Sequence, residues 1–168
     1  MSRANTGPLC FEDLEVGQEW QSPGRTVTEA DIVNYAGLSG DFNAVHIDHE
    51  YAKTTPFRRP IAHGFLVFSM ASGLGVSSPA TNIVALLRVD EWHFREPTFI
   101  GDTIRVRTRV EEVTAKGRGR RAEVRWYRCI LNQEDKVLQD GIVVTLVAGR
   151  MTVKDRPRDE EVAVSPKG

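Results

Sequence analysis

Cysteine is scarce in this sequence, which has Cys10 and Cys129 among 168 residues. Two cysteines are too few for the disulfide framework of a small secreted domain, so we expect two reduced, partly buried thiols. Long apolar runs are missing as well, since none approaches the roughly 20 residues of a membrane-spanning helix. Residues 1–8 contain no apolar segment of the kind that a signal peptide needs. These absences predict a cytoplasmic protein with no membrane partner.

An excess of charge is also missing, because the formal net charge is −1. Nucleic acids and anionic membranes attract strongly basic surfaces, so we expect neither as a partner. The hydrophobic content of 40% and the charged content of 27% are those of an ordinary globular protein. The length fits one domain, which we predict at residues 10–149. We expect a flexible leader at residues 1–9 and a charged flexible tail at residues 150–168.

The apolar pattern changes from helical to alternating along the chain. One helix is predicted at residues 28–38, where Thr28 and Asp31 form a capping pattern. A second, at residues 64–76, is apolar on nearly every face and is therefore expected to be buried. Strands are predicted at residues 18–27 (interrupted at 22–24), 83–94, 103–113, 120–131 and 137–147. This order predicts an α+β domain in which an antiparallel sheet surrounds one buried helix.

Arg128 interrupts an otherwise apolar series. Ala122, Val124 and Trp126 alternate with polar residues, so one face of the strand at 120–131 is expected to be buried. Arg128 falls where the next buried side chain would stand. We therefore predict a β-bulge at Arg128, which would break the alternation there.

The stretch from Tyr35 to His63 is rich in polar and turn-forming residues. It contains the turn sequence Ser-Gly-Asp at 39–41, and His46 follows Asp41 by five residues with little helix-forming sequence between them. A loop of this length inside a compact domain is usually functional. A carboxylate and an imidazole on it form a candidate acid/base pair, in which either residue is able to act as the base.

Three other kinds of site are disfavoured by spacing. His46, Asp48, His49 and His63 match no strong zinc pattern and no cysteine pair supports them, so we expect no metal. His63 is instead expected to be a structural hydrogen-bonding residue beside the site. The sequence has neither a nucleotide-binding glycine loop nor the nucleophile elbow of a serine hydrolase.

The polar stretch resembles the signature of the MaoC-like dehydratases, also called R-specific enoyl-CoA hydratases or hydratase 2. The residues in register with that signature are Tyr35, Leu38, Ser39, Gly40, Asp41, Asn43, Val45, His46 and Ala52. Ala44 departs from it, since the family usually has proline there, but the change removes no chemical group. The resemblance continues through residues 59–64 and 94–104, and in all it covers roughly residues 10–148.

This resemblance implies a fold, a site and an activity. The family has the hotdog fold, an antiparallel sheet wrapped around a long central helix. By position, Asp41 and His46 would be catalytic and the backbone N–H of Gly64 would hold the oxyanion. Asn43 would order the loop or touch substrate, and Ser72 aligns with a helix position that contacts substrate in similar hydratases.

The implied reaction is the reversible hydration of a trans-2-enoyl-CoA thioester to a (3R)-3-hydroxyacyl-CoA. Coenzyme A is part of the substrate, and no metal or redox cofactor is implied. The resemblance also implies a homodimer, or a larger homo-oligomer built from dimers. Two alternatives remain open at this point: an acyl-CoA thioesterase of the same fold, and a non-catalytic subunit that binds acyl-CoA.

Overall fold

A computed structural model describes residues 7–150 of the chain. The elements are η1 (Phe11–Asp13), β1 (Glu19–Gln21), β2 (Arg25–Thr26), α1 (Glu29–Ser39), α2 (Ala44–Ile47), α3 (His49–Thr54), α4 (Gly64–Gly75), β3 (Ile83–Phe94), β4 (Thr103–Lys116), η2 (Gly117–Gly119), β5 (Arg121–Leu131) and β6 (Val137–Ala148).

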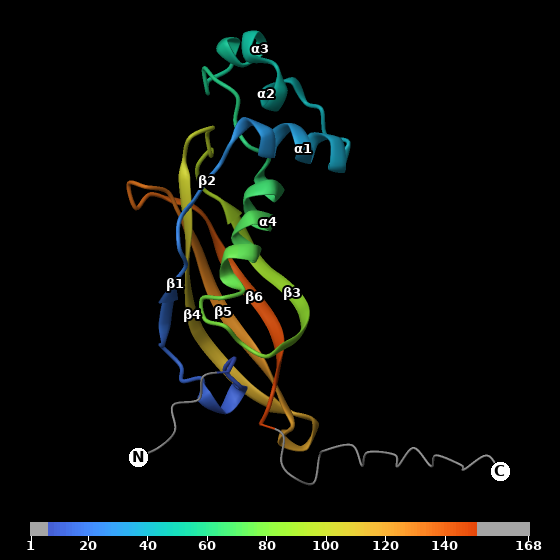
Figure 1. Cartoon of the computed structure of the whole chain (residues 1–168), viewed down its shortest axis with the longest axis vertical. Coiled ribbons are helices and arrows are strands. Elements are labelled where there is room, and N and C mark those ends of the chain that lie inside the picture. The colour runs from blue at the N-terminus through green and yellow to red at the C-terminus, as the bar shows by residue number, and fades with distance from the viewer. Residues whose placement is uncertain (1–6, 151–168) are drawn as a thin grey trace, which may run out of the picture.

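The fold is built on one antiparallel sheet with strand order β1-β4-β5-β6-β3. The short strand β2 pairs with the first residues of β4. The long strands curve around α4, while α1, α2 and α3 form a small helical lobe beyond one end of the sheet (Figure 1). This is the hotdog architecture, so the predicted α+β fold is confirmed. Among the residues that the structure describes, no helix is long and apolar enough to cross a membrane.

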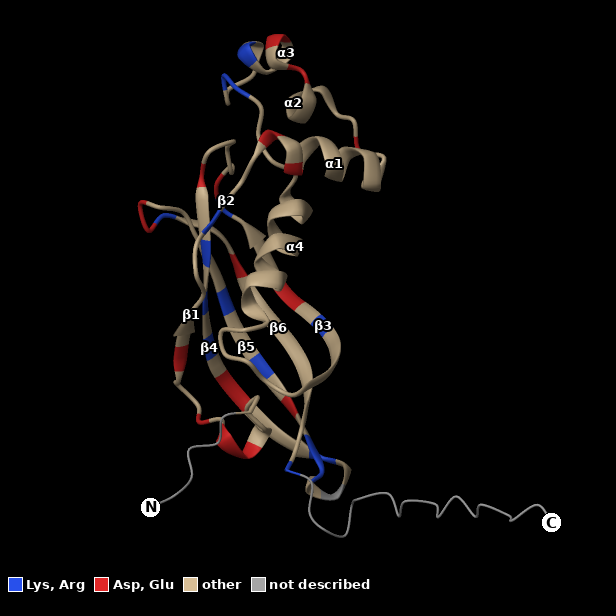
Figure 2. Cartoon of the chain, in the orientation of Figure 1, with Lys and Arg blue, Asp and Glu red and all other residues tan. Residues whose placement is uncertain are grey.

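The central helix α4 is buried on one side. Leu66, Val67, Met70 and Ala71 pack into the main core with residues of β4, β5 and β6. Figure 2 shows Lys, Arg, Asp and Glu along the strands and none on α4. Phe65, however, is 65% exposed. The expectation that every face of α4 is buried is therefore wrong for a single chain, because the sheet covers one side of the helix only.

Local hydrogen bonds determine the helical lobe. Thr28 and Asp31 cap α1 reciprocally, as predicted, and Gly40 ends this helix with a φ of 78°. Asp48 caps α3 by accepting from two backbone N–H groups. The expectation of irregular structure around His46 is wrong, because residues 44–47 form one helical turn. The Asn43 side chain stabilises this turn by accepting a hydrogen bond from a backbone N–H.

The predicted bulge at Arg128 is also wrong. Arg128 keeps its register, opposite Thr108 on β4 and Gly141 on β6, and the irregularity between β5 and β6 lies at Ile130 and Leu131 instead. The Arg128 side chain therefore stays in the inward-facing series and is buried in the interior of the fold.

Each end of the described segment bonds to the rest of the fold. The Leu9 N–H donates to the Ala80 carbonyl at 2.8 Å, and the Arg150 guanidinium pairs with Asp13. Leu9 and Arg150 lie just outside the predicted domain of residues 10–149, and each bonds to a residue inside it. The rest of the predicted leader and tail, residues 1–6 and 151–168, lies outside the described residues. Both cysteines are free and buried.

Candidate active site

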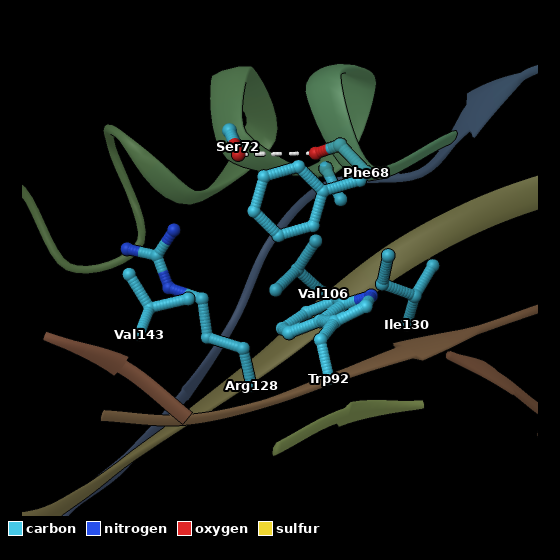
Figure 3. Close-up of a pocket in the computed structure, with 8 residues that line it drawn as sticks. Phe68, Ser72, Trp92, Val106, Arg128, Ile130 and Val143 are labelled. Carbon is cyan, nitrogen blue, oxygen red and sulfur yellow. Dashed lines mark hydrogen bonds between the residues drawn. The ribbon is translucent and has the colours of Figure 1, made fainter. Parts of the chain in front are cut away.

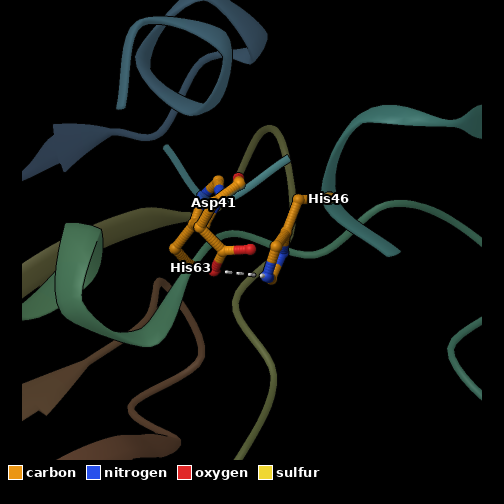
Figure 4. A group of neighbouring side chains, drawn as sticks. All are labelled: Asp41, His46 and His63. Carbon is orange, nitrogen blue, oxygen red and sulfur yellow. Dashed lines mark hydrogen bonds and ion pairs between the residues drawn. The ribbon is translucent and has the colours of Figure 1, made fainter. Parts of the chain in front are cut away.

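Asp41 and His46 meet beside the start of α4. Asp41 follows the glycine that ends α1, and His46 projects from the single turn of α2. Asp41 Oδ2 lies 3.9 Å from His46 Nε2 (Figure 4). This separation is longer than a direct hydrogen bond. The two groups therefore face each other across a gap that a bound atom could occupy.

The second nitrogen of His46 determines which ring nitrogen carries the hydrogen. His46 Nδ1 lies 2.8 Å from the Ile61 carbonyl oxygen. Because a carbonyl only accepts, Nδ1 carries the hydrogen and Nε2 presents a lone pair toward Asp41. Burial lowers the pKa of the His46 imidazole, and the neighbouring His63 lowers it further. The hydrogen bond to Ile61 and the Asp41 carboxylate raise this pKa, but the lowering effects are larger. The imidazole is consequently neutral near pH 7, and both groups are hydrogen-bond acceptors.

His63 holds the two residues in place. Its Nε2–H donates to the backbone carbonyl of Asp41 at 2.9 Å, and its ring stacks on that of His46 with centroids 3.8 Å apart. His63 is 3% exposed, and its Nδ1 has no hydrogen-bond partner within residues 7–150. The geometry agrees with the structural role that the sequence suggested, although the two contacts themselves could not be read from it.

The same three residues offer a donor set that fits a cation. One oxygen of Asp41 and one nitrogen each of His46 and His63 lie within 4.8 Å of one another. His49, which the sequence placed in a possible metal group, turns away instead and lies 2.7 Å from Glu29. Of the four residues considered from the sequence, His46 and His63 therefore come together, while His49 does not join them and Asp48 caps α3.

Gly64 lies next to this pair. It is the first residue of α4, and no side chain caps the start of the helix. With His46 it lines an open cleft of about 400 Å³. A Cβ atom at Gly64 would stand 2.7 Å from the Phe94 ring, so close packing also requires glycine at this position. A helix N-terminus facing a cleft attracts developing negative charge.

Gln139 on β6 is a site residue that sequence reasoning missed. Its Nε2 donates to the Gly64 carbonyl at 2.9 Å, and its Oε1 accepts from Trp92 Nε1 at 3.0 Å. It lines the cleft and is 2% exposed. The signal was available as a polar residue in the inward-facing series of β6, together with Val143 and Thr145.

The remaining candidates occupy different places. Asn43 orders the loop, since its side chain caps α2 and its backbone N–H donates to Asp41 Oδ1 at 3.2 Å. Ser72 lies two turns further along α4, where its hydroxyl donates to the Phe68 carbonyl at 3.0 Å. Ser72 lines a separate small space and not the cleft beside His46. The structure thus brings Asp41, His46 and Gly64 together with Asn43 behind them, and leaves Ser72 apart.

Comparison with known proteins identifies the family of this chain. The (R)-specific enoyl-CoA hydratase of Rhodospirillum rubrum is 33% identical over 141 residues, covering 83% of this chain and 92% of the relative. Protein MaoC of Klebsiella aerogenes is 39% identical over 106 residues, which are 63% of this chain and 32% of that longer protein. The solved MaoC-like dehydratase of Rhodospirillum rubrum superposes with a TM-score of 0.75 at 28% identity, covering 86% of this chain and 99% of that one. Residues 13–127 match the MaoC like domain, and the chain belongs to the MaoC-like dehydratase family.

Proposed function

We propose that this chain is an (R)-specific enoyl-CoA hydratase, which reversibly adds water to a trans-2-enoyl-CoA to give a (3R)-3-hydroxyacyl-CoA. One observation carries the proposal: two acceptors, the Asp41 carboxylate and the His46 Nε2, face one gap of 3.9 Å. A water molecule has two hydrogens to donate, so it fits between two acceptors. The named activities of the relatives, and their similarity over most of the chain, support the same reaction.

The proposed chemistry follows from this arrangement. As the water oxygen bonds to C3, one of its O–H bonds breaks and the proton passes to the Asp41–His46 pair. Electrons of the double bond move toward the thioester oxygen, where the N–H of Gly64 and the positive end of α4 stabilise the negative charge. The Asp41–His46 pair then gives up a proton, which bonds to C2, so that the thioester is restored and the pair returns to its starting state. Water addition is neither an oxidation nor a reduction, so the proposal includes no redox cofactor, and coenzyme A enters as part of the substrate.

The first test is an assay of the purified chain with a short trans-2-enoyl-CoA. We expect the absorbance of the conjugated enoyl thioester to fall without release of free thiol, and the product to have the 3R configuration. The matched control is the saturated acyl-CoA, which a hydratase leaves unchanged. Thiol release from either thioester would instead support a thioesterase. Binding of acyl-CoA without turnover of any chain length would indicate a non-catalytic subunit.

We propose further that the chain forms a homodimer through β3. This twelve-residue strand is the last in the sheet, so one of its edges is unpaired within the described chain. It also exposes Ile83, Val84, Leu86, Leu87 and Val89. A long apolar edge strand is a site for pairing with another chain, and a second copy of β3 has the same length and the same apolar residues. The exposed Phe65 on α4 gives a second apolar contact.

Light scattering after gel filtration tests the dimer. We expect a mass of twice 18.8 kDa at assay concentrations. Leu87→Lys is expected to reduce the dimer fraction, because a charge would be buried at the proposed interface. Val16→Lys, at an exposed position far from β3, is the matched control and should leave the mass unchanged. A single-chain mass for the parent protein would refute this interface.

A further inference from the structure

An arginine lies inside the fold, and no carboxylate within residues 7–150 pairs with it. Arg128 projects from the central strand β5 toward α4, between the buried Trp126 and Ile130, and is 8% exposed (Figure 3). Its Nε is buried and has no hydrogen-bond partner in the described part of the chain. Burial alone lowers the pKa of the guanidinium, with no carboxylate opposing it. An uncompensated buried charge is among the costliest features that a core can have.

The surroundings of Arg128 leave room for its guanidinium. Gly75, the last residue of α4, has no side chain, and a Cβ atom there would stand 3.1 Å from Arg128 Nη1. The carbonyl end of α4 carries a partial negative charge that favours a cation nearby. That partial charge compensates a full positive charge in part only, so the position still lacks an anion.

Thr108 is a second buried polar residue on the inward face of the sheet that lacks a hydrogen-bond partner in the described part of the chain. It lies directly opposite Arg128 on β4, and paired residues of antiparallel strands point to the same face. Its hydroxyl is buried and makes no hydrogen bond within residues 7–150. Ser72 lines the same small space as Arg128, but the hydrogen of its hydroxyl is donated to the Phe68 carbonyl. Among the described residues that line the space none is a carboxylate, and the Arg128 guanidinium is the group whose N–H donors are available to an anion.

This space lies along the same face of α4 as Gly64. Gly64, Phe68 and Ser72 are four residues apart and thus share one face of α4. Ser72 stands about 12 Å along the helix axis from Gly64 at 1.5 Å per residue. Gln139 bonds both the Gly64 carbonyl and Trp92, and Trp92 lines the space around Arg128. The cleft and the space around Arg128 are therefore connected through the hydrogen bond between Gln139 and Trp92.

We propose that Arg128 binds a carboxylate at the far end of the acyl group, so that the preferred substrates are coenzyme A thioesters of unsaturated dicarboxylic acids. The inference rests on the proposed hydratase function and names its substrate class. A guanidinium and a carboxylate form two parallel hydrogen bonds, which fix the orientation of the carboxylate as well as its position. The thioester would lie at Gly64, the reacting double bond at Asp41 and His46, and the free carboxylate at Arg128.

Entry of the acyl chain into the space beside Arg128 requires one movement. The space beside Arg128 has a volume of about 10 Å³ without substrate, which is about the size of a single water. The Phe68 ring stands edge-on to Trp92, with centroids 4.7 Å apart, and closes the space from the side of the catalytic cleft. Both rings are half-buried, so their outer sides are free to accept the shift.

The test compares two series of trans-2-enoyl-CoA esters of matched length, one ending in a carboxylate and the other in a methyl group. We expect kcat/KM of the parent protein to favour the carboxylate series at one chain length by on the order of 10- to 100-fold, as charge-assisted hydrogen bonds allow. Arg128→Met, which keeps a long apolar side chain, should abolish or reverse this ratio. Arg128→Lys, which keeps the charge without the planar fork, should restore part of it.

Arg107→Met is the matched control, because Arg107 is exposed on the outer face of β4 and the variant changes the charge equally. It should leave the ratio as in the parent. The melting temperature of Arg128→Met is expected to equal or exceed that of the parent, since a buried unpaired charge is removed. This separates a binding effect from misfolding.

The outcomes distinguish this proposal from the proposed function. Hydration of the methyl series with equal or lower rates for the carboxylate series, or an unchanged ratio in Arg128→Met, would overturn the Arg128 site and leave the hydratase standing. If neither series is hydrated, calorimetry with saturated ω-carboxyacyl-CoA and its methyl analogue decides. Selective binding of the carboxylate that Arg128→Met loses would still support the site, and equal binding would refute it.

Discussion

Asp41→Asn is expected to lower kcat for enoyl-CoA hydration by on the order of 10²- to 10⁴-fold, the usual contribution of a general acid or base. The amide presents N–H donors where the carboxylate presents an acceptor, so the water between residues 41 and 46 loses one of its two partners. The amide oxygen remains able to accept the hydrogen bond from the Asn43 N–H, which preserves the loop. The fold should therefore be retained, and KM should change much less than kcat.

Glu50→Gln is the matched control for this variant. Glu50 lies on α3 in the same helical lobe, is exposed, and pairs with Lys53 at the surface. The substitution removes the same charge without touching the site, so kcat should stay near that of the parent. Steady-state kinetics and thermal unfolding of both variants give the comparison. If kcat of Asp41→Asn equalled that of the parent, Asp41 would have no part in proton transfer.

Trp126→Ala is expected to reduce the free energy of unfolding by about 3–5 kcal/mol, as for other large aromatic residues removed from a core. Trp126 is 1% exposed and belongs to the second core cluster, between the sheet and the N-terminal segment. Its Nε1 donates to the Thr145 hydroxyl at 2.9 Å, and Trp20 stands edge-on at 6.5 Å. The alanine leaves both a cavity and an unpaired hydroxyl. Urea unfolding measures the loss.

Two controls separate these contributions. Val16→Ala removes apolar atoms from an exposed position and should cost little. The double variant Trp126→Phe with Thr145→Val removes donor and acceptor together, so it should be less destabilising than Trp126→Phe alone. A loss for Trp126→Ala no larger than that for Val16→Ala would show that this cluster contributes little to stability.

Much of the fold could be predicted from local pattern. The alternation along residues 103–113 identified β4, and the reciprocal Thr28–Asp31 pattern identified the start of α1, because both signals act within a few residues. The turn α2 escaped prediction because four residues give no helical periodicity, and its stability comes from the Asn43 cap. The exposed side of α4 escaped as well, since apolar sequence does not reveal how far a sheet extends around a helix.

Only the site residues within or next to the family signature could be predicted from the sequence. Asp41, His46 and Gly64 lie in or next to the recognisable stretch, and the structure brings them together. Gln139 and Arg128 lie on strands far from that stretch, and their inward direction depends on the register of β4, β5 and β6. Arg128 was assigned to a bulge because a lone arginine is unfavourable in a core, yet such a local conflict is what a binding site produces.

The two histidine-to-carbonyl hydrogen bonds, His46 to Ile61 and His63 to Asp41, also join parts of unequal stability. The helical lobe of residues 29–60 buries few side chains, chiefly Ile32, Ala36 and Ala52, whereas α4 and the sheet share a dense core. Segments with few buried contacts open more often than the core does. On warming, the lobe would therefore separate from Gly64 while the strands remain paired, so that loss of turnover precedes cooperative unfolding and the inactive protein keeps the circular dichroism of an intact sheet.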